Sequence, residues 1–157
     1  MRATTKFREL MEKEKCIGMP GVYDCFSARL VEKMGFASVY VTGYGIEATK
    51  LGRPDLGLSG MSEVTDHASN ICDTVNVPVI CDSDVGWGGV LNVMRTVRAF
   101  EKAGVAGIHI EDQGIPKKCG GLEGRKNITL DEIVGKVRAA KEALTDPDFV
   151  LIARSDA

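Results

Sequence analysis

The sequence predicts an α/β fold in which helices cover a parallel β-sheet, and two observations lead to that prediction. Short apolar segments rich in β-branched residues recur along the chain, as in strands that are buried on both faces. Between most of them lie longer segments whose apolar residues recur at helical spacing. Such a pattern fits either a closed barrel or an open doubly wound sheet, and both place function at the carboxyl ends of the strands.

Five segments are predicted to be strands. In chain order they are Gly21–Tyr23, Ala37–Thr42, Val77–Cys81, Gly107–Ile110 and Phe149–Ala153. The helical patterns begin with an amphipathic stretch that contains Phe7 and Leu10, within an N-terminal helix region of residues 1–19. Four more follow at Phe26–Met34, Ser62–Val75, Val90–Phe100 and Thr129–Leu144, the last opened by a capping-box spacing and stopped by Asp146-Pro147.

The composition, with 44% hydrophobic and 27% charged residues, is ordinary for a globular protein, and residues 1–157 are expected to form one domain or part of one. A formal net charge of -2 with both signs interspersed indicates neither a nucleic acid nor a membrane as partner. The amino terminus carries no apolar signal segment, so a cytoplasmic location is expected. Five scattered cysteines without a Cys-x-x-Cys pair argue against a disulfide framework and a zinc site.

Four of the five predicted strands are followed by acidic residues. These are Asp24, Asp82 with Asp84, Glu111 with Asp112, and Asp156. One such carboxylate is explained by a helix cap. Together they favour a site, in which Asp82, Asp84 and Glu111 supply the hard oxygen ligands that Mg²⁺ prefers.

Tyr44–Met61 is predicted to be a long active-site loop, because glycine and proline interrupt it and its match to a dinucleotide fingerprint is weak. Backbone N–H groups near Gly43 and Tyr44 are expected to receive a carboxylate or enolate oxygen. Asp55 within it is either a general base or a loop-stabilising residue.

Cys119 follows two lysines, Lys117 and Lys118, which would favour a thiolate, and it is also a candidate proton donor. The alternative is a charged surface loop. Arg154 is expected to bind a substrate carboxylate bidentately, with a surface salt bridge as the alternative. His109 is predicted to pack within the sheet, and Trp87 to be a wall of the site or a core residue.

Four motifs resemble the isocitrate lyase and phosphoenolpyruvate mutase superfamily from about Pro20 to the last residue. They are Asp82–Gly88, Ile110–Gln113, Pro116–Gly120 and Ile152–Ala157. The Lys-Lys-Cys-Gly segment is similar to the lyase branch that includes methylisocitrate lyase and dimethylmalate lyase.

The resemblance implies a (β/α)8 TIM-type barrel, here with about five of its eight strands. It implies Mg²⁺ or Mn²⁺ held by Asp82, Asp84 and Glu111, with Asp55, Lys117 and Cys119 as catalytic residues. Cys119 would protonate the carbanion that cleavage releases. The implied substrate-binding residues are Thr42, Gly43, Tyr44, Asp82, Gly120 and Arg154.

The implied activity is carbon–carbon cleavage of a 2-hydroxy carboxylic acid to a 2-oxo acid, such as pyruvate, and a second carboxylate. The alternatives are a carboxyphosphonoenolpyruvate or phosphonopyruvate mutase, an oxaloacetate hydrolase, or a non-catalytic truncated fragment. Gly121 departs from the histidine usual in the lyases, which leaves the substrate open. Because a closed barrel takes about 250 residues, we expect either a piece of a longer protein or a truncated product whose open strand edges need a partner, with little activity alone. The resemblance implies a homo-oligomer, typically a homotetramer, for the full-length protein.

Overall fold

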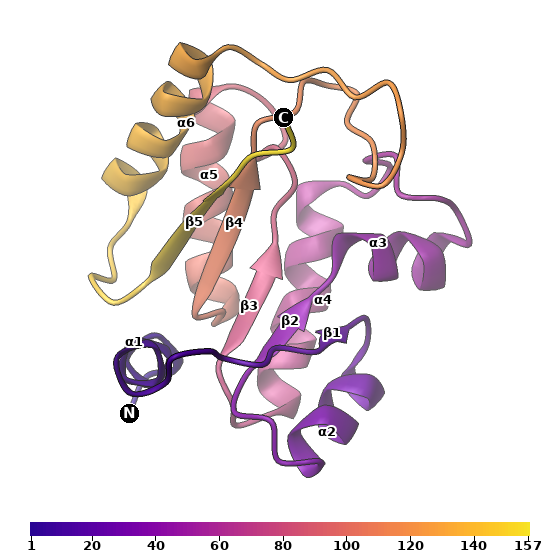
Figure 1. Cartoon of the computed structure of the whole chain (residues 1–157). Helices are drawn as coiled ribbons and strands as arrows, with labels where there is room; N and C mark the ends of the chain where they lie inside the picture. The colour runs from indigo at the N-terminus through magenta and orange to yellow at the C-terminus, as the bar shows by residue number, and fades with distance from the viewer.

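A single sheet of five parallel strands organises the computed structural model, which describes residues 1–157 (Figure 1). The strands lie in the sheet in their order along the chain. They are β1 (Gly21–Val22), β2 (Val39–Val41), β3 (Val79–Asp82), β4 (Gly107–Glu111) and β5 (Val150–Arg154). This sequential parallel order confirms the predicted α/β class and is the strand order of the first part of a TIM-type barrel.

The helices of the chain are α1 (Ala3–Lys13), α2 (Cys25–Lys33), α3 (Gly43–Ile46), the π-helical η1 (Glu47–Leu51), α4 (Met61–Thr74), α5 (Val90–Ala103) and α6 (Leu130–Ala143). Helices α2, α4, α5 and α6 connect successive strands and cover the outer face of the sheet, whereas α1 precedes β1, and α3 and η1 follow β2 at the carboxyl ends of the strands (Figure 1). The predicted capping box of α6 is present, since the Thr129 hydroxyl accepts from Glu132 N–H and Glu132 accepts from Thr129 N–H. The apolar stripe of α5, with Val93, Val97 and Phe100, is fully buried against the sheet core.

The opposite, inner face of the sheet divides into an apolar and a polar part. Near the amino ends of the strands, Phe7 of α1 packs with Ile80, Ala106 and Val150. Because side chains alternate between faces, the residues two positions beyond Ile80 and beyond Ile152 project from this same face. Asp82 and Arg154 therefore lie at the carboxyl ends of the inner face, where the strand register also pairs Glu111 with Arg154.

The segment after β2 differs from the predicted long loop. The Thr42 hydroxyl accepts from Gly45 N–H at 3.2 Å and starts a helical stretch that runs through α3 and η1 to Leu51. It ends at Gly52, whose φ of 61° is the left-handed conformation typical of a helix end. The irregular loop is therefore limited to residues 52–60, and it contains Asp55.

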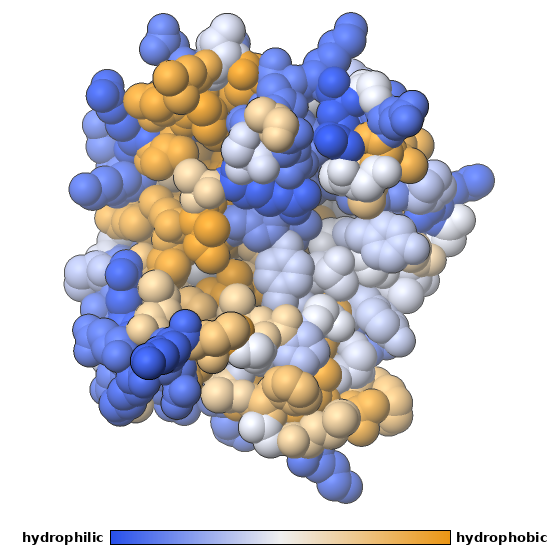
Figure 2. Space-filling view, viewed as in Figure 1, coloured by the Kyte–Doolittle hydropathy of each residue, from blue (hydrophilic) through white to orange (hydrophobic).

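Apolar side chains are exposed at both lateral ends of the sheet. Figure 2 shows one group over β5 and α6, where Leu130 is 77% and Ile152 37% exposed, and another over α2, where Phe26 is 79% exposed. None of the helices combines the length and the apolar character needed to span a bilayer.

Candidate active site

A cavity of about 150 Å³ lies at the carboxyl ends of β2 to β5. Its lining residues come from four strands at their carboxyl ends, from α3 and from two loops: Tyr40, Thr42, Tyr44, Asp55, Asp82, Glu111, Lys117, Lys118, Cys119, Gly120 and Arg154. Nine of these were predicted from the sequence. Gly43 and Asp84 do not line the cavity but contact residues that do.

Backbone amides fix the Asp82 carboxylate. Its Oδ1 accepts from Asp84 N–H at 2.9 Å, and its Oδ2 accepts from Gly43 N–H at 3.3 Å. The Gly43 amide, which we expected to be free for a substrate oxygen, is therefore engaged by Asp82. Asp84 adopts a left-handed φ of 46°, which is rare for a residue with a side chain and is typical of functional turns.

Lys117 joins two of the predicted carboxylates. Its Nζ lies 2.5 Å from Asp55 Oδ1 and 2.6 Å from Asp84 Oδ1, and all three side chains are buried. Burial lowers the pKa of Lys117, but the carboxylates outweigh burial and raise it. Lys118 Nζ reaches the Glu123 carbonyl instead. The adjacency of the two lysines suggested that they favour a Cys119 thiolate, but the direct partners of Lys117 are buried carboxylates that need a counterion.

Burial is the largest influence on the pKa values of Asp84 and Glu111. It raises the pKa of Asp84 to about 7, with the neighbouring Asp82 charge acting in the same direction. It also raises the pKa of Glu111 to about 8. Glu111 Oε1 is buried without a hydrogen-bond partner.

The residues present fit a divalent cation in composition, although they do not form a closed ligand set. No group of three or more His, Cys, Asp or Glu side chains is arranged around one point, because Asp84 contacts Lys117 rather than converging with Asp82 and Glu111. Negative charge nevertheless exceeds positive charge here. Asp55 and Asp84 share the Lys117 cation, Glu111 and Asp156 share the Arg154 cation, and Asp82 has no ion pair with either of them. The unpartnered Glu111 oxygen and the raised pKa values are what a cation would relieve.

Arg154 is already paired in a bidentate manner. Its Nε and Nη2 donate to the two carboxylate oxygens of Asp156 at 2.8 and 3.2 Å, and its Nη1 lies 3.6 Å from Glu111 Oε2. Gln113 Nε2 also donates to Asp156, at 2.6 Å, and to the Lys118 carbonyl. The predicted free fork for a substrate carboxylate is thus occupied by a residue two positions further on, and Gln113 ties this pair to the Cys119 loop.

Tyr40 is a site residue that sequence reasoning missed. Its hydroxyl contacts His109 Nε2, the two rings stack with centroids 5.4 Å apart, and His109 Nε2 lies 3.6 Å from Asp82 Oδ1. Burial raises the pKa of Tyr40 and lowers that of His109. His109 is buried within the sheet, as predicted. The sequence could have indicated Tyr40, because side chains alternate along a strand and Tyr40 therefore lies on the same face as Thr42. Trp87 stacks on Phe100 and is a partly buried residue that packs against the core.

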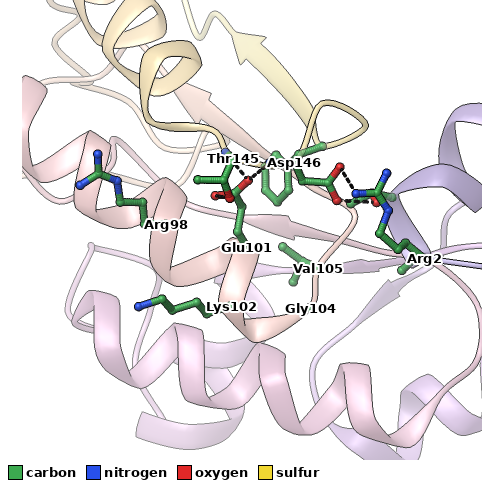
Figure 3. A pocket seen from close by; sticks show the side chains of 11 residues that line it. Arg2, Arg98, Glu101, Lys102, Gly104, Val105, Thr145 and Asp146 are labelled. Carbon is green, nitrogen blue, oxygen red and sulfur yellow. Dashed lines mark hydrogen bonds and ion pairs between the residues drawn. The ribbon is translucent and has the colours of Figure 1, made fainter.

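A larger cavity of about 520 Å³ lies near the amino ends of the strands, between α1, the end of α5 and the turn before β5 (Figure 3). Most of its charged groups are used within the fold. Arg2 pairs with Asp146 at 2.9 Å, and Glu101 accepts from the N–H groups of Thr145 and Asp146. These contacts fix the turn between α6 and β5, so the charged residues of this cavity have a structural role.

Known proteins with similar sequence and structure point to one family. The family described as phosphoenolpyruvate phosphomutase matches residues 7–157. The 2,3-dimethylmalate lyase of Eubacterium barkeri is 47% identical over 157 residues, which cover 100% of this chain and 54% of that protein. An oxaloacetate acetylhydrolase in complex with the inhibitor 3,3-difluorooxalacetate superposes with a TM-score of 0.94 at 43% identity, covering 99% of this chain and 54% of that one.

A phosphonopyruvate hydrolase in complex with oxalate and Mg²⁺ superposes with a TM-score of 0.90 at 30% identity, covering 100% of this chain and 53% of that one. The chain therefore spans about half the length of the relatives it matches.

Proposed function

This chain belongs to the phosphoenolpyruvate phosphomutase family, which it matches over residues 7–157, and from that premise we propose that it carries the pocket of a divalent-metal-dependent carbon–carbon lyase. The proposed substrate is a 2-hydroxy carboxylic acid of the methylisocitrate or dimethylmalate kind. The products are a 2-oxo acid such as pyruvate and a second carboxylate. The observation that carries the proposal is that a thiol, Cys119, lines one pocket with Asp82, Glu111 and Arg154.

Asp82, Asp84 and Glu111 would hold Mg²⁺ or Mn²⁺, which when bound supplies positive charge for substrate oxygens. Arg154 would bind a substrate carboxylate by exchanging its Asp156 partner for the ligand, since both present the same two oxygens to the guanidinium. Lys117 fixes Asp55 at the pocket wall through the 2.5 Å contact.

The proposed reaction balances with two proton transfers by residues of this chain. The substrate hydroxyl gives its proton to a base, for which Asp55 is the candidate, and its carbon becomes the carbonyl of the 2-oxo acid. The electron pair of the broken carbon–carbon bond moves to the neighbouring carbon. That carbon takes the proton of the Cys119 thiol.

A phosphonate mutase or a 2-oxo acid hydrolase is the alternative within the same family. The position of Cys119 favours the lyase, because a phosphorus–carbon rearrangement does not need a proton donor there. Gly121 adds no side chain beside the thiol, and the position is open, since a Cβ added there would meet no atom within 4 Å. We therefore leave the choice between substituted malates and citrate-like acids to the assay.

The test begins with calorimetric titration of the chain with oxalate, with and without Mg²⁺, followed by assays of Mg²⁺-dependent cleavage of 2,3-dimethylmalate and 2-methylisocitrate. Oxalate binding that requires Mg²⁺ is expected. Where cleavage is measurable, Cys119→Ser should abolish it and leave oxalate binding intact. Cys16→Ser is the matched control, since Cys16 is exposed and outside the pocket. Undiminished cleavage by Cys119→Ser would contradict the assigned role, and a folded chain that binds no oxalate would favour a non-catalytic fragment.

A further inference from the structure

Glu47 is a buried carboxylate to which the proposed reaction gives no role. It lies in η1, is 2% exposed and does not line the active-site cavity. Its side chain pairs with no cation. Instead, Oε1 accepts from the N–H groups of Leu58 at 2.6 Å and Ser59 at 2.8 Å, and Oε2 accepts from Leu56 N–H at 3.2 Å. One carboxylate therefore binds three amides of the loop 52–60.

The loop 52–60 has few other attachments to the fold. The Glu47 carbonyl accepts from Arg53 N–H at 3.2 Å, and the Trp87 indole donates to the Ser59 carbonyl at 2.9 Å. Within the loop, Gly57 has a φ of 69°, so no regular helix continues through it. The Glu47 carboxylate thus supplies three of the hydrogen bonds that attach this loop to the fold.

The same loop carries the contacts that reach the pocket. The Asp55 carboxylate meets Lys117, and the Asp55 carbonyl accepts from Cys119 N–H at 2.9 Å. The place of the candidate base and the backbone of the candidate acid therefore both depend on where the loop is held.

We propose that Glu47 is a positioning residue, which seats the loop 52–60 so that Asp55 meets Lys117 and the backbone of Cys119. Its relevance to cleavage rests on the proposed function. The seating of the loop does not, and it is measured separately.

Glu47→Gln is the perturbing variant, because it keeps the shape of the side chain but turns an amide donor toward amides that need acceptors. Glu63→Gln is the matched control. Glu63 Oε2 accepts from Gly60 N–H at 2.8 Å, so the same chemical change falls at the last residue of the loop, where α4 begins, without touching the amides of residues 56–59 that Glu47 binds.

Two readouts report on the loop directly. Trp87 is the one tryptophan of the chain, and its indole is bonded to Ser59, so its fluorescence reports loop seating. The alkylation rate of Cys119 by iodoacetamide, resolved by mass spectrometry, reports exposure of the loop it contacts. Cys81 is fully buried in the core and serves as the internal reporter of global unfolding.

In Glu47→Gln we expect a red-shifted Trp87 emission and a Cys119 alkylation rate raised about tenfold, equivalent to about 1.4 kcal/mol. Cys81 should stay protected, and Glu63→Gln should behave as the wild type. Wild-type behaviour of Glu47→Gln would overturn the proposal. Equal acceleration at Cys119 and Cys81 would also overturn it, since Glu47 would then support the whole fold.

If Glu47→Gln does not fold, Glu47→Asp decides the question. It keeps the charge but is one methylene too short, so the proposal requires faster Cys119 alkylation with Cys81 still protected, and an unchanged rate overturns it. A wild-type chain that binds no oxalate with Mg²⁺ would count against the proposed function alone, because these loop measurements need no ligand.

Discussion

Replacing Lys117 with methionine removes the one cation in contact with both Asp55 and Asp84. The three side chains are only 5%, 7% and 10% exposed for Lys117, Asp55 and Asp84, respectively. Methionine has a similar length and no charge, so the change leaves two buried carboxylates without their counterion while filling much of the same space. The effect on the free energy of unfolding therefore reports the charge.

The magnitude follows from the geometry and from the titration of Asp84. Each contact has a gross attraction of about 6 kcal/mol at an effective dielectric constant of about 20. Desolvation opposes this attraction, so removing one partner of a buried pair costs about 3–5 kcal/mol, which is the loss we expect at pH 8. Burial and the Asp82 charge raise the pKa of folded Asp84 to about 7, above its unfolded value.

At pH 5 folded Asp84 is therefore protonated, and its attraction to Lys117 is absent. It appears only as the pH rises through about 7. The loss in Lys117→Met should accordingly shrink to roughly half, about 2 kcal/mol, at pH 5, where Asp55 alone lacks its counterion.

The assay is urea unfolding of the metal-free chain at pH 5 and pH 8, followed by Trp87 fluorescence and circular dichroism. Lys118→Met is the matched control, since Lys118 Nζ reaches only the Glu123 carbonyl at 3.4 Å, and it should change stability by no more than about 0.5 kcal/mol. An equal loss at both pH values would refute the titration argument. A loss below about 1 kcal/mol at pH 8 would refute the view that Lys117 is the counterion of these carboxylates.

Two further predictions concern the metal. Affinity for Mg²⁺ should fall from pH 8 to pH 6, because burial raises the pKa values of Asp84 and Glu111 to about 7 and about 8. The fall should be about tenfold per pH unit for each proton that the cation displaces. Calorimetry in buffers of different ionisation enthalpy should detect this proton release, and a pH-independent affinity would contradict the prediction. Gly43→Ala should weaken Mg²⁺ binding in the same titration, because the added Cβ would lie 2.8 Å from Asp82 Oδ2. Gly121→Ala is the control, since a Cβ there would meet no atom within 4 Å. Equal affinities of the two variants would show that the position of Asp82 does not matter for Mg²⁺ binding.

The sheet could be predicted because its signals are local. A strand buried on both faces is apolar at every position, as in Val79–Cys81, and the end of α6 is marked by residues next to it in sequence. The stretch from Gly43 to Leu51 was missed because it is too short to show an amphipathic stripe. The glycines and the proline that follow it mark the loop 52–60 correctly but say nothing about the residues before it.

The sequence could predict which residues gather in the pocket, but not which carboxylate pairs with which cation. Parallel strands bring their carboxyl ends to one edge, so Asp82, Glu111 and Arg154 had to gather whatever the loops do. Which carboxylate takes which cation depends on side-chain directions and burial. Lys117 pairs with Asp55 and Asp84, which are 62 and 33 positions away along the chain, and sequence spacing carries no information about that pairing.

The pairing of Lys117 also bears on the two roles that the sequence left open for Cys119. Neighbouring cations stabilise a thiolate, and the adjacent lysines suggested one in the sequence, with a proton donor as the other role. Lys117 is committed to buried carboxylates, Lys118 reaches the Glu123 carbonyl, and Arg154 is held by Asp156 and lies near Glu111. These three cations are engaged elsewhere and none is hydrogen-bonded to the Cys119 thiol, which is consistent with the proposed role of Cys119 as an acid that gives a proton to a carbanion.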